Sequence, residues 1–164
     1  RSKSIRYSRP YLNIKQALLV NRMELVKNNI ENNPMKYLRT EKVKIGVLAN
    51  SSYVDYAYDL FEKAEVVQYS QWEDAIEDVK NGKITAAFYD DIEIVRLVRN
   101  NPDIVLYASV YVLKDKKDPI AIGINAKDEN LLAWVNAYLD TYEIDEDVNS
   151  LIKEYPEVFS EQQD

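Results

Sequence analysis

The chain has 164 residues, 46% of them hydrophobic and 30% charged, and its net charge is −7 because 28 acidic residues outnumber 21 basic ones. This composition is typical of a folded protein of one domain or slightly more, and the negative charge argues against nucleic acid as a partner. The chain has no Cys and no His, which excludes zinc sites built on them and any mechanism with a His base or a Cys nucleophile. Its three Gly leave no room for a Gly-rich phosphate loop.

The middle of the chain alternates between strand and helix patterns. Short apolar runs predict strands there, and apolar residues spaced three and four apart predict helices. In chain order we expect a strand at 42–49, a helix at 51–63, a strand at 66–69, a helix at 71–81, a strand at 84–89, a helix at 91–100 and a strand at 104–108. This alternation predicts an α/β fold with a mostly parallel sheet flanked by helices.

The two flanks of this region have other patterns. Before it we expect an extended apolar strand at 14–22 and a short helix at 34–38, where a proline at the first helical position follows an Asn cap. After it we expect a charged turn at 114–118, a strand at 119–124 and two amphipathic helices at 128–142 and 145–155. The predicted apolar face of the first of these helices contains Leu131, Trp134, Val135, Tyr138 and Leu139.

Three polar residues, Asn50, Ser51 and Ser52, follow the strand at 42–49 and open the next helix. The free backbone N–H groups of a helix start favour an anion, and the two hydroxyl groups add further donors. The alternative is that Ser51 only caps the helix, which is the commonest role of Ser at such a position. The three residues also match a glycosylation sequon, which is a short and unspecific motif.

A pair of acidic residues, Asp90 and Asp91, follows the strand at 84–89. Ligands of parallel sheets bind outside the carboxyl ends of the strands, so Asp90 is expected at the same edge as Asn50. The alternative is that Asp90 is a helix cap and Asp91 a solvated acid in the first turn. A phospho-receiver site would need another acidic residue at the end of the preceding strand, which instead ends in Ala49 and Asn50.

No metal or cofactor is predicted. Asp145, Asp147 and Asn149 match the first half of a calcium loop, but Ser150 replaces the Gly of the sixth position and Pro156 the closing acid.

Four segments occur in the order found in the amino-acid-binding branch of the type II periplasmic solute-binding proteins, extracellular solute-binding protein family 3. The segment RSKSIRYSRPY resembles the family's entry into the hinge, and KVKIGVLANSSYVDYA resembles its second-lobe strand and the helix start after it. The segment SQWEDAIEDVKNGKITAAFYDD resembles its helix, Gly, strand and Asp. The segment IAIGINAKDENLLAWVNAYL resembles its return strand and the helix that follows.

This resemblance implies four ligand-binding residues. Arg1 would bind the α-carboxylate of an amino acid, Ser51 and Ser52 would help at the helix start, and Asp90 would pair with the α-ammonium. A planar guanidinium suits a carboxylate. Asn50 stands where the family has Gly, and Asn tolerates the left-handed backbone better than most residues.

The resemblance also implies a domain organisation and a role. Residues 1–13 would be a remnant of the first lobe and the hinge entry, 14–124 the second lobe and 125–164 the C-terminal helices, because most of the family's first lobe precedes the position of Arg1. The expected function is non-catalytic capture of a small zwitterion, most simply an amino acid, for a membrane permease outside the cytoplasm. No cofactor is expected.

Three alternatives remain open from the sequence. The chain can be the extracytoplasmic sensory domain of a larger membrane protein, or part of a fused transporter. It can be an enzyme on the same fold, such as a dehydratase, with Asp90 or Glu93 as acid or base. It can be an interaction module that forms a homodimer through its C-terminal helices, whose apolar face the family covers with its first lobe.

Overall fold

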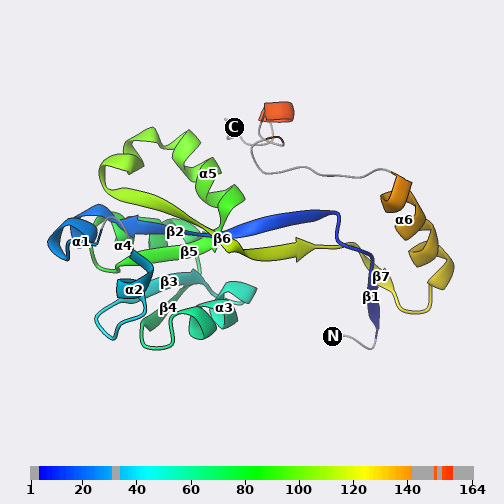
Figure 1. The fold of residues 1–164 in the computed structure, drawn as a ribbon, viewed down its shortest axis with the longest axis horizontal. Coiled ribbons are helices and arrows are strands. Elements are labelled where there is room, and N and C mark those ends of the chain that lie inside the picture. Colours follow the sequence, from blue (N-terminus) through cyan, green and yellow to red (C-terminus); the bar gives the residue numbers. More distant parts are fainter. Residues whose placement is uncertain (1–3, 31–33, 142–149, 151–152, 157–164) are drawn as a thin grey trace.

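The protein is described by a computed structural model over residues 4–30, 34–141, 150 and 153–156. Figure 1 shows an α/β body joined by two long strands to a small second body. The α/β body contains the strands β2 (Leu12–Asn21), β3 (Lys44–Leu48), β4 (Glu65–Tyr69), β5 (Ala86–Asp90) and β6 (Ala108–Ile120). Its helices are α1 (Arg22–Lys27), α2 (Pro34–Leu38), α3 (Ser52–Leu60), α4 (Trp72–Lys80), α5 (Asp91–Asn100) and the 3₁₀ helix η1 (Pro102–Leu106). The second body contains β1 (Ile5–Tyr7), β7 (Gly123–Asn125) and α6 (Glu129–Thr141).

The central sheet has five strands in the order β4-β3-β5-β2-β6. The α/β class and the helices on both faces are confirmed, but the sheet is mixed rather than mostly parallel. The strand β3 runs parallel to β4 and β5, whereas β2 runs antiparallel to β5 and β6. The reason is that β2 and β6 carry the chain into and out of the body as one long antiparallel pair.

Two predicted elements are wrong. The strand expected at 104–108 is the 3₁₀ helix η1, which begins at Pro102 and buries Ile104. The charged turn expected at 114–118 belongs to the extended strand β6, which contains a bulge where Lys15 pairs with Lys117 and Gln16 pairs with Leu113. The helix expected at 145–155 lies mostly outside the described residues.

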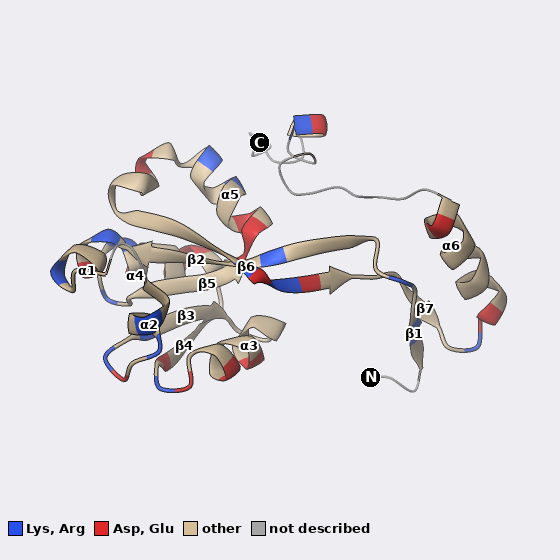
Figure 2. Ribbon diagram, in the orientation of Figure 1, with Lys and Arg blue, Asp and Glu red and all other residues tan. Residues whose placement is uncertain are grey.

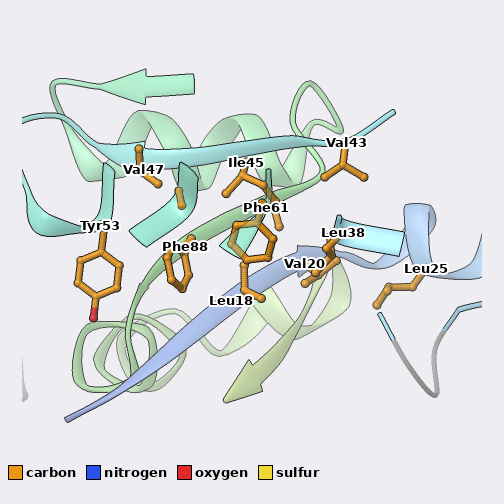
Figure 3. Packing of buried hydrophobic residues seen from close by; sticks show 12 residues of the cluster. Leu18, Val20, Leu25, Leu38, Val43, Ile45, Val47, Tyr53, Phe61 and Phe88 are labelled. Atoms are coloured by element: carbon orange, nitrogen blue, oxygen red, sulfur yellow. The ribbon is translucent and has the colours of Figure 1, made fainter. Parts of the chain in front are cut away.

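Two hydrophobic clusters cover the two faces of the sheet. The first packs β2, β3 and β5 against α1, α2 and α3, and Figure 3 shows its side chains. The second packs β2 and β5 against α4, α5 and η1. The consecutive buried residues Leu18 and Leu19 belong to opposite clusters, because side chains alternate between the faces of a strand.

The second body is held together by strand pairing and by two ion pairs from residues near the amino end of the chain. Strands β1 and β7 pair antiparallel. Arg6 forms an ion pair of 3.0 Å with Glu129, and Arg9 forms one with Asp140, so both arginines fasten α6. Within the described part of the chain, no helix has the length and apolar character needed to cross a membrane.

Candidate functional site

The starts of α3 and α5 lie at one edge of the sheet. Each helix follows a strand, and those strands, β3 and β5, are adjacent and parallel. Their carboxyl ends therefore meet, and so do the two helix N-termini. Figure 2 shows charged residues where α5 begins and where β2 and β6 leave the sheet beside this edge. This is the edge at which parallel sheets bind ligands.

The start of α3 carries no side-chain cap. Asn50 adopts a left-handed conformation with φ of 61°, and Ser51 occupies the N-cap position. The Ser51 hydroxyl donates to the carbonyl oxygen of Leu48 at 2.7 Å rather than accepting from the helix. Ser51 is therefore the N-cap residue, as the sequence predicted, but its hydroxyl accepts no hydrogen bond from the backbone of the helix. Ser52 is the first helical residue and is exposed, so the helix start faces outward with its hydroxyl and backbone donors.

Asp90 caps α5 with one carboxylate oxygen, which accepts from the backbone N–H of Glu93 at 2.8 Å. The residue is half-buried. Burial raises the pKa of Asp90 to about 6; the bond from Glu93 N–H opposes that rise, while the charges of Glu93 and Asp91 add to it. A half-buried carboxylate among other acids attracts a cation strongly.

Asp91 is buried, contrary to the expectation of a solvated acid. Its carboxylate accepts from the backbone N–H of Lys15 at 2.9 Å. Burial raises the pKa of Asp91, and the interactions with Lys15 oppose that rise. Asp91 therefore fastens the start of α5 to β2 at the point where the bulge begins.

Two buried polar residues beside Asp90 were not identified from the sequence. Gln16 is 5% exposed and Tyr53 is 4% exposed, and among the described residues neither the Gln16 Oε1 atom nor the Tyr53 hydroxyl has a hydrogen-bond partner. Gln16 is the register partner of Asp90 across β2 and β5. The only available signal was that Gln16 is a polar residue on the otherwise apolar face of β2 that contains Ile14 and Leu18.

Aromatic rings surround Tyr53. Its ring lies 5.1 Å from Phe88, 4.9 Å from Tyr89 and 5.6 Å from Tyr56, measured between centroids. The Tyr56 hydroxyl donates to Asp118 of β6 at 3.1 Å, which ties α3 to the strand that leaves the body. The pKa of Tyr53 is raised, first by burial and then by the charges of Asp90 and Asp118.

Arg1 and the calcium-like residues Asp145, Asp147 and Asn149 lie outside the described residues. Of the predicted ligand-binding residues, the structure therefore brings Ser51, Ser52 and Asp90 to one edge and leaves Arg1 unplaced. A separate groove of about 620 Å³ lies between α4 and η1. Its lining includes Lys80, which pairs with Glu77 at 3.0 Å and lies over the ring of Tyr107.

Comparisons with known proteins place this geometry in a fold class. No protein-family model and no curated protein matches the sequence, but solved structures do. A binding component of an ABC transporter from Wolinella succinogenes, complexed with lysine, superposes with a TM-score of 0.72 and 21% identity, over 97% of this chain and 64% of that one. The substrate-binding protein AbpA of an amino acid ABC transporter from Streptococcus pneumoniae, bound to L-arginine, gives 0.69 and 21%, over 99% and 65%.

A periplasmic domain of another protein also has this fold. The periplasmic VFT2 domain of BvgS from Bordetella pertussis gives a TM-score of 0.70 and 18% identity, over 94% of this chain and 62% of that one. The chain thus has the type II periplasmic-binding-protein fold, and the resemblance found in the sequence is confirmed at the level of the fold. This chain spans 62–65% of the length of these three matched chains.

Proposed function

We propose that this chain binds a small zwitterion, most simply an amino acid, without catalysis. The observation that carries the proposal is the meeting of two unlike helix starts at one edge of the sheet. The start of α3 offers hydroxyl and backbone donors for a carboxylate. The start of α5 carries the half-buried carboxylate of Asp90, which suits an ammonium group. One zwitterion satisfies both.

The roles of the individual residues follow from this arrangement. Ser52 and the backbone donors beside Ser51 bind the ligand carboxylate, and Arg1 adds a bidentate guanidinium. Asp90 pairs with the ammonium. The ligands bound in two similar structures, lysine and L-arginine, are amino acids with both groups and so support this assignment.

The domain organisation expected from the sequence belongs to the same proposal. Residues 14–124 form the ligand-binding lobe, 1–13 are the hinge entry with a remnant of the first lobe, and 125–164 are the C-terminal helices. The strands β2 and β6 then act as the hinge, about which a second lobe closes on the ligand. Closure outside the cytoplasm would be recognised by a membrane permease. The alternative is a sensory domain within a larger protein, which is supported by BvgS, where the similar VFT2 domain is one part of a longer periplasmic domain.

A calorimetric titration of the full gene product with the twenty common amino acids tests the proposal. We expect one or a few of them to bind. We expect Asp90→Ala to weaken that binding at least 100-fold, because the desolvated ammonium group of the ligand loses its carboxylate partner. Asp74→Ala is the matched control, since it removes the same charge from the exposed first turn of α4. Binding that Asp90→Ala leaves intact, or the absence of binding by every amino acid, would overturn the proposal.

An enzyme on this fold is the second candidate, because a carboxyl group with a pKa of about 6 suits a general acid. We favour binding, since Asp90 already accepts a bond from Glu93 and stands beside donors that suit a carboxylate. Turnover of the bound amino acid, followed by mass spectrometry, would reverse this preference.

A further inference from the structure

Two buried oxygen atoms beside Asp90 have no hydrogen-bond partner in the part of the chain that the structure describes. They are the Oε1 atom of Gln16 and the hydroxyl of Tyr53. A buried polar atom without a partner costs about 1–3 kcal/mol, and native proteins rarely retain one without a reason. The position of these two atoms supplies the reason.

Both side chains lie on the same face of the sheet as Asp90. Gln16 is two residues before Leu18, and Asp90 two residues after Phe88; Leu18, Phe88 and Tyr53 belong to the cluster that packs on α3. The pairing of β2 with β5 sets Gln16 directly opposite Asp90. Asp90 is also the charge that acts most strongly on the Tyr53 hydroxyl.

The local structure holds both residues at this place. The bulge between Lys15 and Gln16 interrupts the pairing of β2 with β6 immediately before Gln16, and bulges often redirect a side chain beside a functional site. Tyr53 is fixed by the rings of Phe88, Tyr89 and Tyr56. Figure 3 shows its ring at the end of the cluster, with the hydroxyl pointing away from Val47.

We infer that Gln16 and Tyr53 complete the ammonium pocket. A primary ammonium group would then donate three hydrogen bonds, one each to the Asp90 carboxylate, the Gln16 carbonyl oxygen and the Tyr53 hydroxyl oxygen. This inference rests on the proposed function and narrows its ligand class. Three oxygen acceptors match a primary amine, which has three N–H donors when protonated. An Nα,Nα-dimethyl amino acid has one such donor and leaves two of the oxygen atoms unsatisfied.

The test compares two affinities, that of the common amino acid that binds the full gene product most tightly and that of its Nα,Nα-dimethyl derivative. We expect the wild-type protein to prefer the primary amine at least 10-fold. Tyr53→Phe and Gln16→Met each remove one acceptor at nearly constant volume. Each should weaken binding of the primary amine about 10- to 100-fold, as for hydrogen bonds to charged groups, and should reduce the preference at least 5-fold.

Two control variants separate this role from a structural one. Thr40→Val removes another buried hydroxyl without a partner, near the amino end of β3. Tyr37→Phe removes a hydroxyl that donates to Glu24 at 3.2 Å. We expect both controls to keep the preference of the wild-type protein. In the ligand-free protein, Tyr53→Phe should leave the free energy of unfolding unchanged or raise it, whereas Tyr37→Phe should lower it.

The outcomes distinguish this inference from the proposed function. If no amino acid binds the wild-type protein, both fall. If an amino acid binds and Asp90→Ala abolishes binding, but Tyr53→Phe and Gln16→Met keep the preference for the primary amine, only the inference is overturned. A loss of preference in both variants supports it, because a general structural defect would weaken both ligands alike.

Discussion

At the scale of single residues, the site depends on carboxyl groups in contrasting surroundings. Asp91 is buried and satisfied by the backbone of Lys15. Asp90 is half-buried, uses one oxygen for the cap of α5 and has a pKa raised to about 6 by burial. The carboxylate of Asp91 is therefore occupied by a structural hydrogen bond. The charged form of Asp90 is the one that a bound cation would stabilise more.

The affinity for an amino acid should consequently depend on pH. An ammonium ligand binds the ionised form of Asp90, so protonation of Asp90 competes with binding. We expect affinity to be constant above pH 7 and to fall about 10-fold per unit as pH drops below about 6. Calorimetric titrations between pH 4.5 and 8 measure this, and Asp90→Asn should remove the dependence. A wild-type affinity that is flat over this range would contradict the role of Asp90.

The stability of the ligand-free protein should have the opposite pH dependence at this residue. The pKa of Asp90 is higher in the folded state, about 6, than the ordinary value of 3.8. The contribution of its protonated form is fully present below pH 3.8 and is lost as pH rises through 6. Wild-type unfolding should thus show a loss of stability over this interval that Asp90→Asn lacks.

At the scale of the elements, α3 shows which part of the fold is encoded locally. In the sequence, Val54, Ala57, Tyr58 and Phe61 occur at helical spacing, which predicts that they share one apolar face of this helix. Ala57 and Phe61 are buried, but Tyr58 is 53% exposed and Tyr53 takes a place in the core. The helix turns Tyr53 inward because its ring packs between Phe88 and Tyr89. These are residues of another strand, which the helix pattern does not reveal.

Tyr58, within α3, and Phe61, at its C-cap, should respond differently to substitution. Phe61 is fully buried against Phe88, with ring centroids 5.4 Å apart, so Phe61→Ala should cost about 3–5 kcal/mol. Tyr58→Ala should change the free energy of unfolding by less than about 0.5 kcal/mol. Urea denaturation measures both. Equal losses would mean that the buried face of α3 is the one predicted from the sequence.

Long-range pairing explains the other differences between sequence and structure. The alternation of strand and helix patterns predicted β3, β4 and β5. It also predicted that the starts of α3 and α5 share one edge of the sheet, and that Asp90 can cap α5. The direction of β2 and β6 was not predictable from local patterns, because it depends on which strands become neighbours. The charged run at 114–118 resembles a turn in composition, yet it is held in β6 by pairing of Lys117 and Asp118 with β2. Gln16 was not identified from the sequence for the same reason, because its position opposite Asp90 depends on the pairing of β2 with β5.

At the scale of the whole molecule, the α/β body and the second body are linked by β2 and β6 (Figure 1). The helix α6 exposes Leu131, Trp134 and Tyr138, and the rings of Trp134 and Tyr138 stack at 5.9 Å. An exposed apolar stripe of this kind is typical of a surface that another protein or domain covers. We propose, in line with the sequence analysis, that a second copy of this chain covers the apolar stripe of α6 when no first lobe is present to cover it.

The 164-residue chain should therefore self-associate through α6. Sedimentation equilibrium should detect dimers at micromolar concentrations, and the double change Leu131→Glu with Trp134→Glu should shift the chain to monomers. Val105→Glu with Leu106→Glu, on the exposed surface of η1, is a matched control that should leave association unchanged. A wild-type chain that stays monomeric would contradict the dimer.

The central claim is that one edge of the sheet binds both charges of a zwitterion. The most direct measurement is calorimetry of the full gene product with three compounds: the amino acid that binds most tightly, its amide, which lacks the carboxylate, and its deamino analogue, which lacks the ammonium. The account predicts that either single-charge compound binds at least 100-fold more weakly than the amino acid. Equal affinity for the amino acid and for either analogue would contradict it.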